Sequence, residues 1–241
     1  MQGRGQYWFS QSGQSILYCG EFFENTFQGL GKMIFTDGST YYGSFTNNAL
    51  ASTRAVMTFS NGDKYKGEIQ ANKRHGDGTY WYGSQALGQM TYEGSFKDDV
   101  RDGKGTLMQA QAPFLKYVGE FKDDKRCGKV DELTIGGVPE EGKKPDVIFK
   151  GRLDQDQNMD GLGVLEMVNE KVKYTGEFQD NMFEGRGKIE YEESGAVFEG
   201  RFEKHFKQGP ATFKLKTGET YSGVYAYNVA KAGHDDFGPR K

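Results

Sequence analysis

One stretch of the chain has the spacing of a phosphate-binding loop. GVPEEGKK, at 137–144, places two glycines and a lysine as such a loop does. It ends in Lys144, where a serine or threonine would hold Mg²⁺, and Glu140 and Glu141 would face the phosphates. The stretch also opens no helix, so we predict no nucleotide site here.

A second stretch begins like a calcium-binding loop. Asp154, Asp156 and Asn158 stand at alternate positions, as the first oxygen ligands of such a loop do. Met159 replaces the glycine of the sharp turn, and Leu165 occupies the position of the bidentate glutamate. A solvated connector is the interpretation we favour, and we expect no metal.

The remaining candidates for catalysis do not form a constellation. His75, His205 and His234 lack the spacing of metal ligands to one another or to a cysteine. We expect His75 and His205 to be surface residues of polar connectors. The tripeptide DFG at 236–238 matches a protein-kinase motif, but no other kinase element accompanies it. Without a nucleophile paired with a base, or a pair of carboxylates, we predict a chain that is not an enzyme and needs no cofactor.

The residues that recur along the chain are aromatics and glycines. An aromatic returns at intervals of 23, 24, 27, 25, 32, 25, 24 and 23 residues, at Tyr18, Tyr41, Tyr65, Tyr92, Tyr117, Phe149, Tyr174, Phe198 and Tyr221. A glycine follows each of them two residues later, at Gly20, Gly43, Gly67, Gly94, Gly119, Gly151, Gly176, Gly200 and Gly223. The most regular copy is YTGEFQDNMFEGRG at 174–187, which ends in a Gly-x-Gly pair. A fixed period of this length indicates a repeat array.

The repeats divide the chain into three parts. Residues 1–17 are interpreted as a partial N-terminal repeat or cap, 18–220 as eight full repeats, and 221–241 as a partial final repeat with a C-terminal cap or tail. The 32-residue interval indicates a loop inserted at about 130–148, which is either inert or a partner contact. A smaller insertion is expected in the repeat that begins at Tyr65. Because composition does not change along the chain, we predict one elongated domain.

Each repeat is predicted to form two antiparallel strands. The segment from the aromatic to the Glu-Phe pair alternates with a period of two, as a strand with one packed face does. A polar connector leads to the second strand, and turns such as TDGS and SNGD lead to the next repeat. We expect Asp-Gly and Asn-Gly to form two-residue turns there, with positive φ at both residues. The predicted fold is therefore all-β, a single-layer antiparallel meander solenoid that is twisted and curved into a trough.

The aromatic, the glycine and the phenylalanine of the first strand share one face, because they are spaced two residues apart. We predict that the bare glycine leaves a slot for an aromatic ring of a neighbouring strand. The rings of the first strands should form ladders perpendicular to the strands and supply the core. Phe23, Tyr42, Trp81 and Tyr82 should instead be exposed and available to a partner.

Composition and charge limit the classes of partner. The net charge is −3 and the two signs are mixed along the chain, so we expect no nucleic-acid binding and no membrane binding by bulk charge. No apolar run approaches the ~20 residues that span a bilayer, and no signal peptide is evident, which favours an intracellular, cytoplasmic protein. Cys19 and Cys127 lie in different repeats, roughly 40 Å apart at ~4.8 Å per strand. We expect two free thiols in a reducing compartment.

The whole pattern, aromatic-x-Gly-Glu-Phe followed by Gly-x-Gly and a turn glycine, resembles the MORN repeat (membrane occupation and recognition nexus) from about Gly3 to Gly223. The resemblance implies a single-layer solenoid whose grooved face binds a helical or extended segment of another protein. It also implies cytoskeletal settings, among them ciliary axonemes and junctional platforms. Some relatives carry a fused methyltransferase or lipid kinase, but the repeats fill this chain and no such domain is expected.

Three functions are therefore compared. The first is a non-catalytic scaffold or adaptor in a cytoskeletal or ciliary assembly. The second is membrane association through phosphoinositides; against it, no cluster of four basic residues occurs, and KDDKRCGK at 122–129 is partly acidic. The third is an accessory subunit of another large complex. Exposed strand edges at both ends of the array predict a homodimer or burial in a larger assembly.

Overall fold

The computed structural model describes residues 1–11, 14–83, 90–111, 113–137 and 144–230. It has two compact units, Met1–Ala112 with Phe121–Asp124, and Pro113–Glu120 with Lys125–Lys241. The sequence predicted one domain. Repeats in an array contact chiefly their neighbours, so an array has no single core that would tie all of its strands into one unit.

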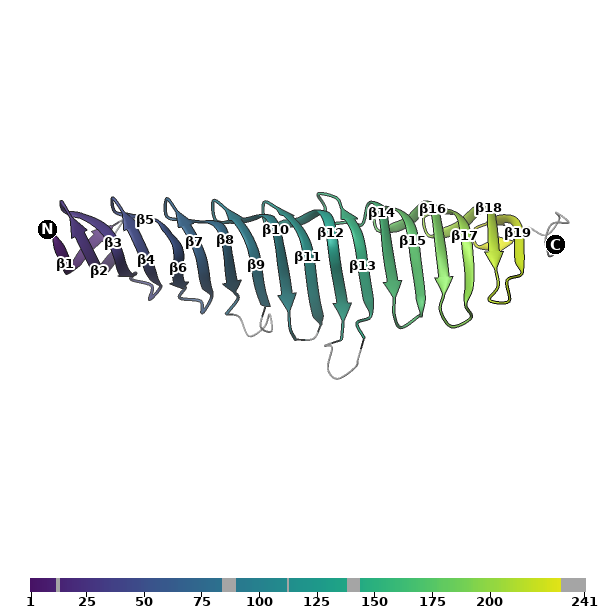
Figure 1. The fold of residues 1–241 in the computed structure, drawn as a ribbon, viewed down its shortest axis with the longest axis horizontal. Coiled ribbons are helices and arrows are strands. Elements are labelled where there is room, and N and C mark those ends of the chain that lie inside the picture. The colour runs from purple at the N-terminus through teal and green to yellow at the C-terminus, as the bar shows by residue number, and fades with distance from the viewer. Residues whose placement is uncertain (12–13, 84–89, 112, 138–143, 231–241) are drawn as a thin grey trace. The chain divides into compact units, whose positions relative to one another are not determined.

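The first unit is a meander of antiparallel strands. Figure 1 shows the strands following one another in chain order, from purple to teal. Each pairs with the next, and the short β5 shares the edge of β4 with β6. The strands are β1 (Gly3–Gln11), β2 (Gln14–Phe23), β3 (Thr26–Ile34), β4 (Thr40–Thr46), β5 (Ala49–Leu50), β6 (Ser52–Thr58), β7 (Lys64–Gln70), β8 (Lys73–Trp81), β9 (Met90–Lys97) and β10 (Val100–Gln109).

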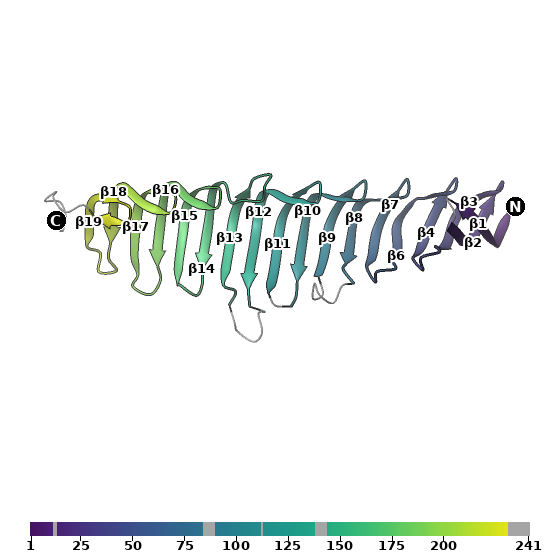
Figure 2. The ribbon, with the colours of Figure 1, turned by 180° about the vertical axis from the view of Figure 1, so that it is seen from behind.

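The second unit repeats this plan. From β12 to β20 each strand pairs antiparallel with the next, as seen from behind in Figure 2. Its strands are β11 (Phe114–Lys122), β12 (Lys125–Gly136), β13 (Val147–Leu153), β14 (Gly161–Met167), β15 (Val172–Gln179), β16 (Met182–Tyr191), β17 (Ala196–Glu203), β18 (Phe206–Lys214), β19 (Thr220–Ala226) and β20 (Val229–Ala230). The described residues contain no helix, which confirms the predicted all-β meander.

The tight turns lie in the connectors within the repeats, the one that begins at Phe149 excepted, where they were not predicted. Two consecutive residues there take positive φ, as at Asn47 (49°) and Asn48 (67°), which is the signature of a two-residue hairpin turn. The Asp-Gly and Asn-Gly turns between repeats differ from the prediction, because only the glycine has positive φ, as at Gly38 (87°). Those turns are longer: Gly38 N–H donates to the carbonyl of Phe35, and the side chain of Asp37 accepts from Ser39 N–H.

The glycines make room for an aromatic ring of their own repeat, not for a ring of a neighbouring strand as predicted. The ring of Tyr18 lies over Gly20 on its own strand and over Gly31 on the next. A Cβ on Gly31 would stand 2.6 Å from Tyr18 Cε2. The Tyr18 hydroxyl reaches past the glycines and donates a hydrogen bond of 2.8 Å to the carbonyl of Glu21. The side chain therefore closes over bare backbone and leaves no buried polar atom without a partner.

The same arrangement recurs in both units. Hydrogen bonds to the carbonyl three residues later are made by Tyr18, Tyr41, Tyr65, Tyr92, Tyr117 and Tyr174. These tyrosines, with Phe149 and Phe198, are at most 1% exposed, which confirms the predicted core. Tyr221, in the last repeat, is only partly buried. Burial raises the pKa of Tyr41 and of Tyr92 to about 12.

Ladders of rings cross the strands, as predicted. Phe22 meets Tyr18 edge-on at 5.1 Å between ring centroids, and Phe45 of the next repeat meets the same ring at 4.9 Å. Phe27, just after the connector, stacks on Tyr18 at 4.0 Å. Edge-on and stacked rings add to the free energy of burial, so each repeat is packed against the next through its aromatics.

A second ladder of hydrogen bonds joins the connectors of successive repeats. Asn48 Oδ1 accepts from Phe27 N–H at 2.7 Å, and Asn48 N–H donates to the Phe27 carbonyl at 3.1 Å. The same pair of bonds joins Leu50 to Asn72, Arg74 to Asp99, Arg101 to Asp124, Met159 to Asn181, Phe183 to His205 and Lys207 to Asn228. The second turn residue thus binds both the N–H and the carbonyl of one residue of the preceding repeat. The sequence analysis did not predict these bonds.

The predicted insertions are only partly visible. Strand β12 continues to Gly136 and β13 begins at Val147, so the inserted segment is shorter than the predicted 130–148. Residues 138–143, which contain most of the stretch GVPEEGKK, lie outside the described residues, as does the smaller insertion at 84–89. The C-terminal stretch 231–241, with its DFG tripeptide and His234, also lies outside them. Cys19 and Cys127 are free thiols, as expected.

Candidate interaction surface

A groove of about 780 Å³ opens on the aromatic side of the first unit. Its floor and walls are mostly apolar, which is typical of a site that binds a ligand or a partner segment. The lining consists of Met1, Tyr7, Phe9, Phe22, Asn25, Phe27, Met33, Phe35, Asn48, Leu50, Met57 and Asn72. We call this set the apolar groove.

The second strands supply the floor of the apolar groove. Met33 lies opposite Tyr18, and Met57 lies opposite Tyr41, so both methionines take the same place in successive repeats. The later repeats of this unit have Tyr80 and Leu107 there. Methionine side chains are flexible and polarizable, so a floor with two of them can adapt to more than one apolar shape.

Strand β1 supplies one wall. Tyr7 and Phe9 stack at 6.0 Å between ring centroids, and Phe9 contacts the ring of Phe27 at 5.4 Å. Tyr7 remains 43% exposed, and Met1 remains 59% exposed. The partial N-terminal repeat thus adds aromatic surface to the groove and does not close it.

The amides on the rim are already engaged. Asn48 and Asn72 bind the backbone of Phe27 and of Leu50, and Asn25 binds the backbone and amino group of Met1. Their side chains are neutral and their Oδ1 atoms are engaged, but the Nδ2 groups keep N–H donors for a partner. Recognition in the groove therefore combines apolar contact with a few neutral hydrogen bonds.

The aromatic side of the sheet gains a charged residue in the repeat that begins at Tyr65. Arg74 takes the place of Phe27 and Leu50, and its guanidinium lies 5.1 Å from the ring centroid of Tyr80 and 5.2 Å from that of Phe96. Its Nε and Nη2 donate to Asp99, at 3.1 and 2.6 Å.

The carboxylate of Asp63, just before the same repeat, is buried and hydrogen-bonded to Tyr80. Asp63 is 9% exposed and accepts hydrogen bonds from the Tyr80 hydroxyl, Gly83 N–H at 2.6 Å and the Asn61 amide. Burial acts to raise the pKa of Asp63, but these hydrogen bonds outweigh it and hold the pKa below its usual value. The carboxylate thereby fixes the backbone that leads into the inserted segment.

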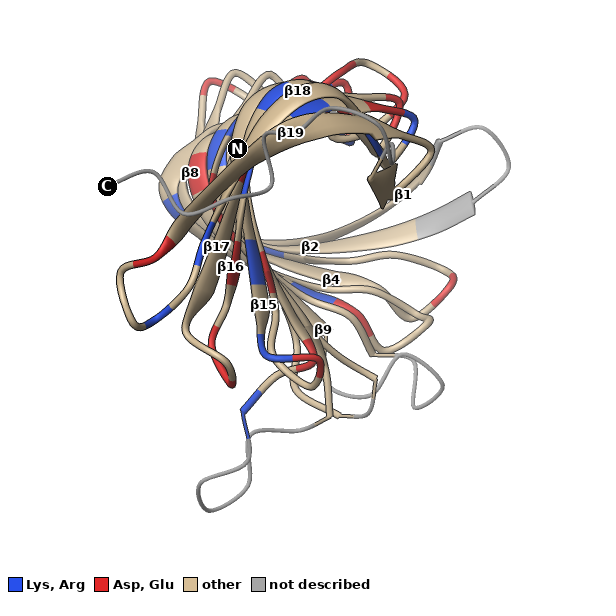
Figure 3. Ribbon diagram, turned by 90° about the vertical axis from the view of Figure 1, so that its right-hand side faces the viewer, with Lys and Arg blue, Asp and Glu red and all other residues tan. Residues whose placement is uncertain are grey.

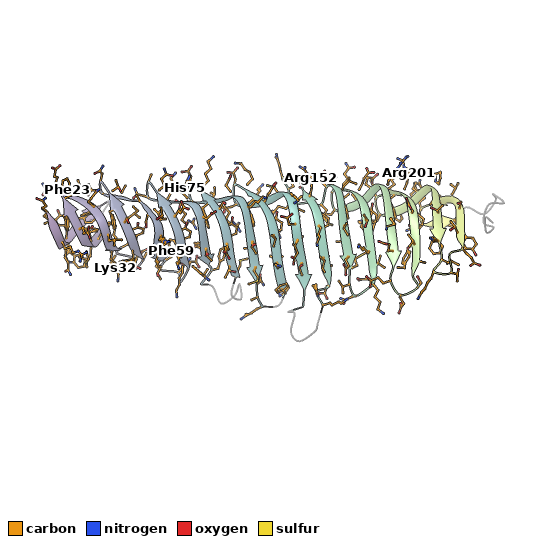
Figure 4. The ribbon with its side chains drawn as sticks, in the orientation of Figure 1. Phe23, Lys32, Phe59, His75, Arg152 and Arg201 are labelled. Carbon is orange, nitrogen blue, oxygen red and sulfur yellow. The ribbon has the colours of Figure 1, made fainter. Side chains whose placement is uncertain are left out.

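The residues predicted to bind a partner do not line the apolar groove. Phe23 and Tyr42 are about half exposed and Trp81 is 39% exposed, as expected. Tyr82 differs, because its ring lies edge-on against Tyr80 at 4.8 Å and is partly buried. The expected aromatics are thus scattered, and their role in binding stays a prediction. Phe23 is labelled in Figure 4, where it points away from the strands.

The opposite face carries open hollows above the glycines. Tyr42 lines one of about 540 Å³ in the first unit, with Arg4, Gln6, Leu30, Lys32 and neighbouring backbone. Another, of about 940 Å³, lies in the second unit between Thr175 and Val224. Both follow from bulges beside the first glycine of a strand pair, which bend the strands there.

A family model decides what the repeats are. The model of the MORN repeat matches residues 18–40, 65–86, 92–110, 117–129 and 174–194. This chain is a MORN repeat protein. The repeats that begin at Tyr41, Phe149 and Phe198 lie outside the matched stretches, yet their aromatics pack over glycines in the same way. No curated protein matches the chain.

MORN repeats form interaction modules for proteins or membranes, and MORN repeat proteins are generally non-catalytic. Within the described ranges of this MORN protein, no group of three or more His, Cys, Asp or Glu side chains could hold a metal ion. Asp154 instead accepts from the backbone N–H groups of Asp156 and Asn158, at 2.8 Å each, and so stabilises its own connector. No helix in the part of the chain that the structure describes is long and apolar enough to cross a membrane.

The histidines of this MORN protein have structural places. His205 is an exposed connector residue, as expected, and in addition its Nδ1 accepts from Phe183 N–H and its ring contacts the Phe183 ring at 4.8 Å. It replaces the asparagine or aspartate of the other connectors. His75 lies on β8 and is partly buried.

Proposed function

We propose that this MORN protein is a non-catalytic scaffold or adaptor that holds a segment of a partner protein in the apolar groove of its first unit. The observation that carries the proposal is the groove itself, which Met33, Met57 and Phe35 line beside Tyr7 and Phe9. A groove with an adaptable apolar floor suits an amphipathic helix or an extended segment with apolar side chains.

A cytoplasmic setting in a cytoskeletal or ciliary assembly is part of the same proposal. Two free thiols suit a reducing compartment, and repeat arrays suit assemblies in which long surfaces meet. We also propose that the chain works as a homodimer or within a larger complex. Its mixed charge argues against a role that depends on anionic lipid, since both signs occur along β15, β16 and β17 (Figure 3).

Site-specific photocrosslinking tests the proposal. Benzoylphenylalanine is placed at Met57, on the floor of the groove, or at Val56, whose side chain is 43% exposed on the opposite face. We expect position 57 to capture a recurring segment of one protein from cells that make this chain, and position 56 to miss it. Equal capture at both positions, or capture at position 56 alone, would contradict the proposal that the partner lies in the groove.

A further inference from the structure

Two arginines face each other directly across the β16–β17 pair. Arg186 and Arg201 are register partners, so their Cα atoms lie about 4.5–5.5 Å apart. Both are exposed, and Figure 4 shows the side chain of Arg201 directed away from the ribbon. Within the described part of the chain, neither guanidinium forms an ion pair or a side-chain hydrogen bond. Like charges in this position destabilise a sheet.

The equivalent register position holds complementary residues in two other strand pairs. Between β1 and β2 it holds Arg4 and Glu21, which form an ion pair of 3.2 Å. Between β8 and β9 it holds Asp77 and Ser95, joined by a hydrogen bond of 3.0 Å. The repeat therefore does not require two cations here, and the pair needs another explanation.

A second pair of opposing cations is neutralised within the chain. Lys129 lies opposite Arg152, but the Lys129 ammonium forms an ion pair of 2.6 Å with Asp131. At the Arg186 and Arg201 pair, Glu177 accepts from the backbone N–H of Arg186, and Glu184 from that of Lys204. Glu199 lines the same hollow, but among the described residues it forms no ion pair with either arginine.

The two arginines line the hollow of about 940 Å³ in the second unit. Lys188 and the hydroxyl-bearing residues Thr175, Thr212 and Ser222 line the same hollow. Two guanidinium groups can bind a carboxylate through parallel N–H donors, and hydroxyls can donate further hydrogen bonds to it.

We propose that Arg186 and Arg201 form an anion site that binds an acidic polypeptide segment, through the carboxylates of its Asp or Glu side chains. A peptide fits better than a membrane for two reasons. The lining offers only Arg186, Lys188 and Arg201 as cations, fewer than the roughly four to eight that hold a segment to an anionic bilayer, and a flexible chain can direct its carboxylates at the arginines and away from Glu199. The site is separate from the apolar groove, which lies in the other unit on the aromatic side.

Fluorescence anisotropy with the full chain tests the site. The probe is labelled octaglutamate at low ionic strength, with octaglutamine as the uncharged comparison. The test variant is R186Q/R201Q. The control is K204Q/K216Q, which removes the same charge from exposed positions in two turns of the same unit. Phosphatidylcholine vesicles with about one quarter phosphatidylserine form the membrane arm.

We expect octaglutamate to bind the wild type, to bind R186Q/R201Q about tenfold more weakly, and to bind K204Q/K216Q within about twofold of the wild type. We also expect R186Q/R201Q to melt no lower than the wild type, because it removes a repulsion. Equal affinity for the wild type and R186Q/R201Q, or no binding of octaglutamate, would overturn the proposal. So would a lower melting temperature, which would mark the arginines as structural. Arginine-dependent binding of the vesicles without binding of the peptide would assign the site to membranes instead. All of these readouts are independent of crosslinking at Met57.

Discussion

Asn48 and Phe27, in successive repeats, are joined by two hydrogen bonds, one from each backbone N–H group. The side chain of Asn48 thereby does what a strand partner would do, at a point where the hairpin has already turned away. Because these bonds join each connector only to those of the neighbouring repeats, we expect the stability of each repeat to depend on its neighbours within the unit.

Substitutions at Asn48 should separate the hydrogen bond from the backbone conformation. We expect Asn48→Ala to lower the free energy of unfolding by about 2–3 kcal/mol, since it removes the acceptor for Phe27 N–H and places alanine at positive φ. Asn48→Gly should cost only about 1 kcal/mol, because glycine tolerates that φ. Asn48→Asp keeps the acceptor and should stay within about 0.5 kcal/mol of the wild type. Urea unfolding measures all three, and equal losses for glycine and aspartate would refute the hydrogen-bond account.

Gly176 should not tolerate a methyl group. A Cβ there would lie 2.5 Å from the Tyr174 hydroxyl and 2.6 Å from the Cα of Gly187, which cannot move aside. We expect Gly176→Ala to cost about 3 kcal/mol of unfolding free energy. Gly137→Ala is the matched control, because a Cβ there meets nothing within 4 Å. Thermal melts of both variants decide the matter, and similar melting temperatures would show that the ring does not need bare backbone.

Asp63 should be a structural carboxylate. Asp63→Ala leaves the Tyr80 hydroxyl and Gly83 N–H without their acceptor in a buried place, so we expect a loss of about 2–3 kcal/mol. Asp37→Ala, at an exposed turn of the preceding repeat, should cost about 0.5 kcal/mol. Denaturant unfolding monitored by tyrosine fluorescence provides the comparison. A loss at Asp37 as large as that at Asp63 would speak against the role of burial.

The buried tyrosines should make the protein sensitive to alkali. Desolvation raises the folded-state pKa of Tyr41 and Tyr92 from 10.0 to about 12, so the folded state retains protons that the unfolded state loses. Their contribution to stability is therefore fully present below pH 10 and is lost as the pH rises through 10 toward 12. Urea midpoints should be flat from about pH 7 to 9 and fall above pH 10. Absorbance of tyrosinate should reach its full value only together with unfolding, and complete ionisation of the tyrosines in the folded protein would contradict the assignment.

Much of the fold follows from local pattern. The period of the aromatics and glycines indicates strands, order and core, because alternation and turn residues act over a few positions. The local pattern does not predict which ring covers each glycine, since a ring from either strand can fill the slot beside it. Only the structure shows that Tyr18 covers Gly20. The hydrogen bonds between connectors could have been predicted from the sequence. A residue with a side-chain acceptor recurs at the second connector position, as at Asn48, Asp99 and His205.

The apolar groove was harder to foresee than the core. Met33 and Met57 belong to second strands whose phase depends on a bulge beside the glycine, and apolar alternation alone did not reveal that phase. Exposed aromatics were sought on the first strands and at the insertion, whereas the structure places the groove on the opposite face from Tyr42. The position of Tyr7 and Phe9 depends on how β1 closes the array.

The most direct test of the central claim is a titration with the partner segment recovered by photocrosslinking, made as a synthetic labelled peptide. Its affinity is measured by anisotropy for the wild type, Met57→Lys and Val56→Lys, which place the same charge on opposite faces of β6. We expect Met57→Lys to weaken binding about tenfold or more, and Val56→Lys to leave it within about twofold. Equal affinity for the wild type and Met57→Lys, or a loss confined to Val56→Lys, would contradict the claim that the apolar groove holds the partner.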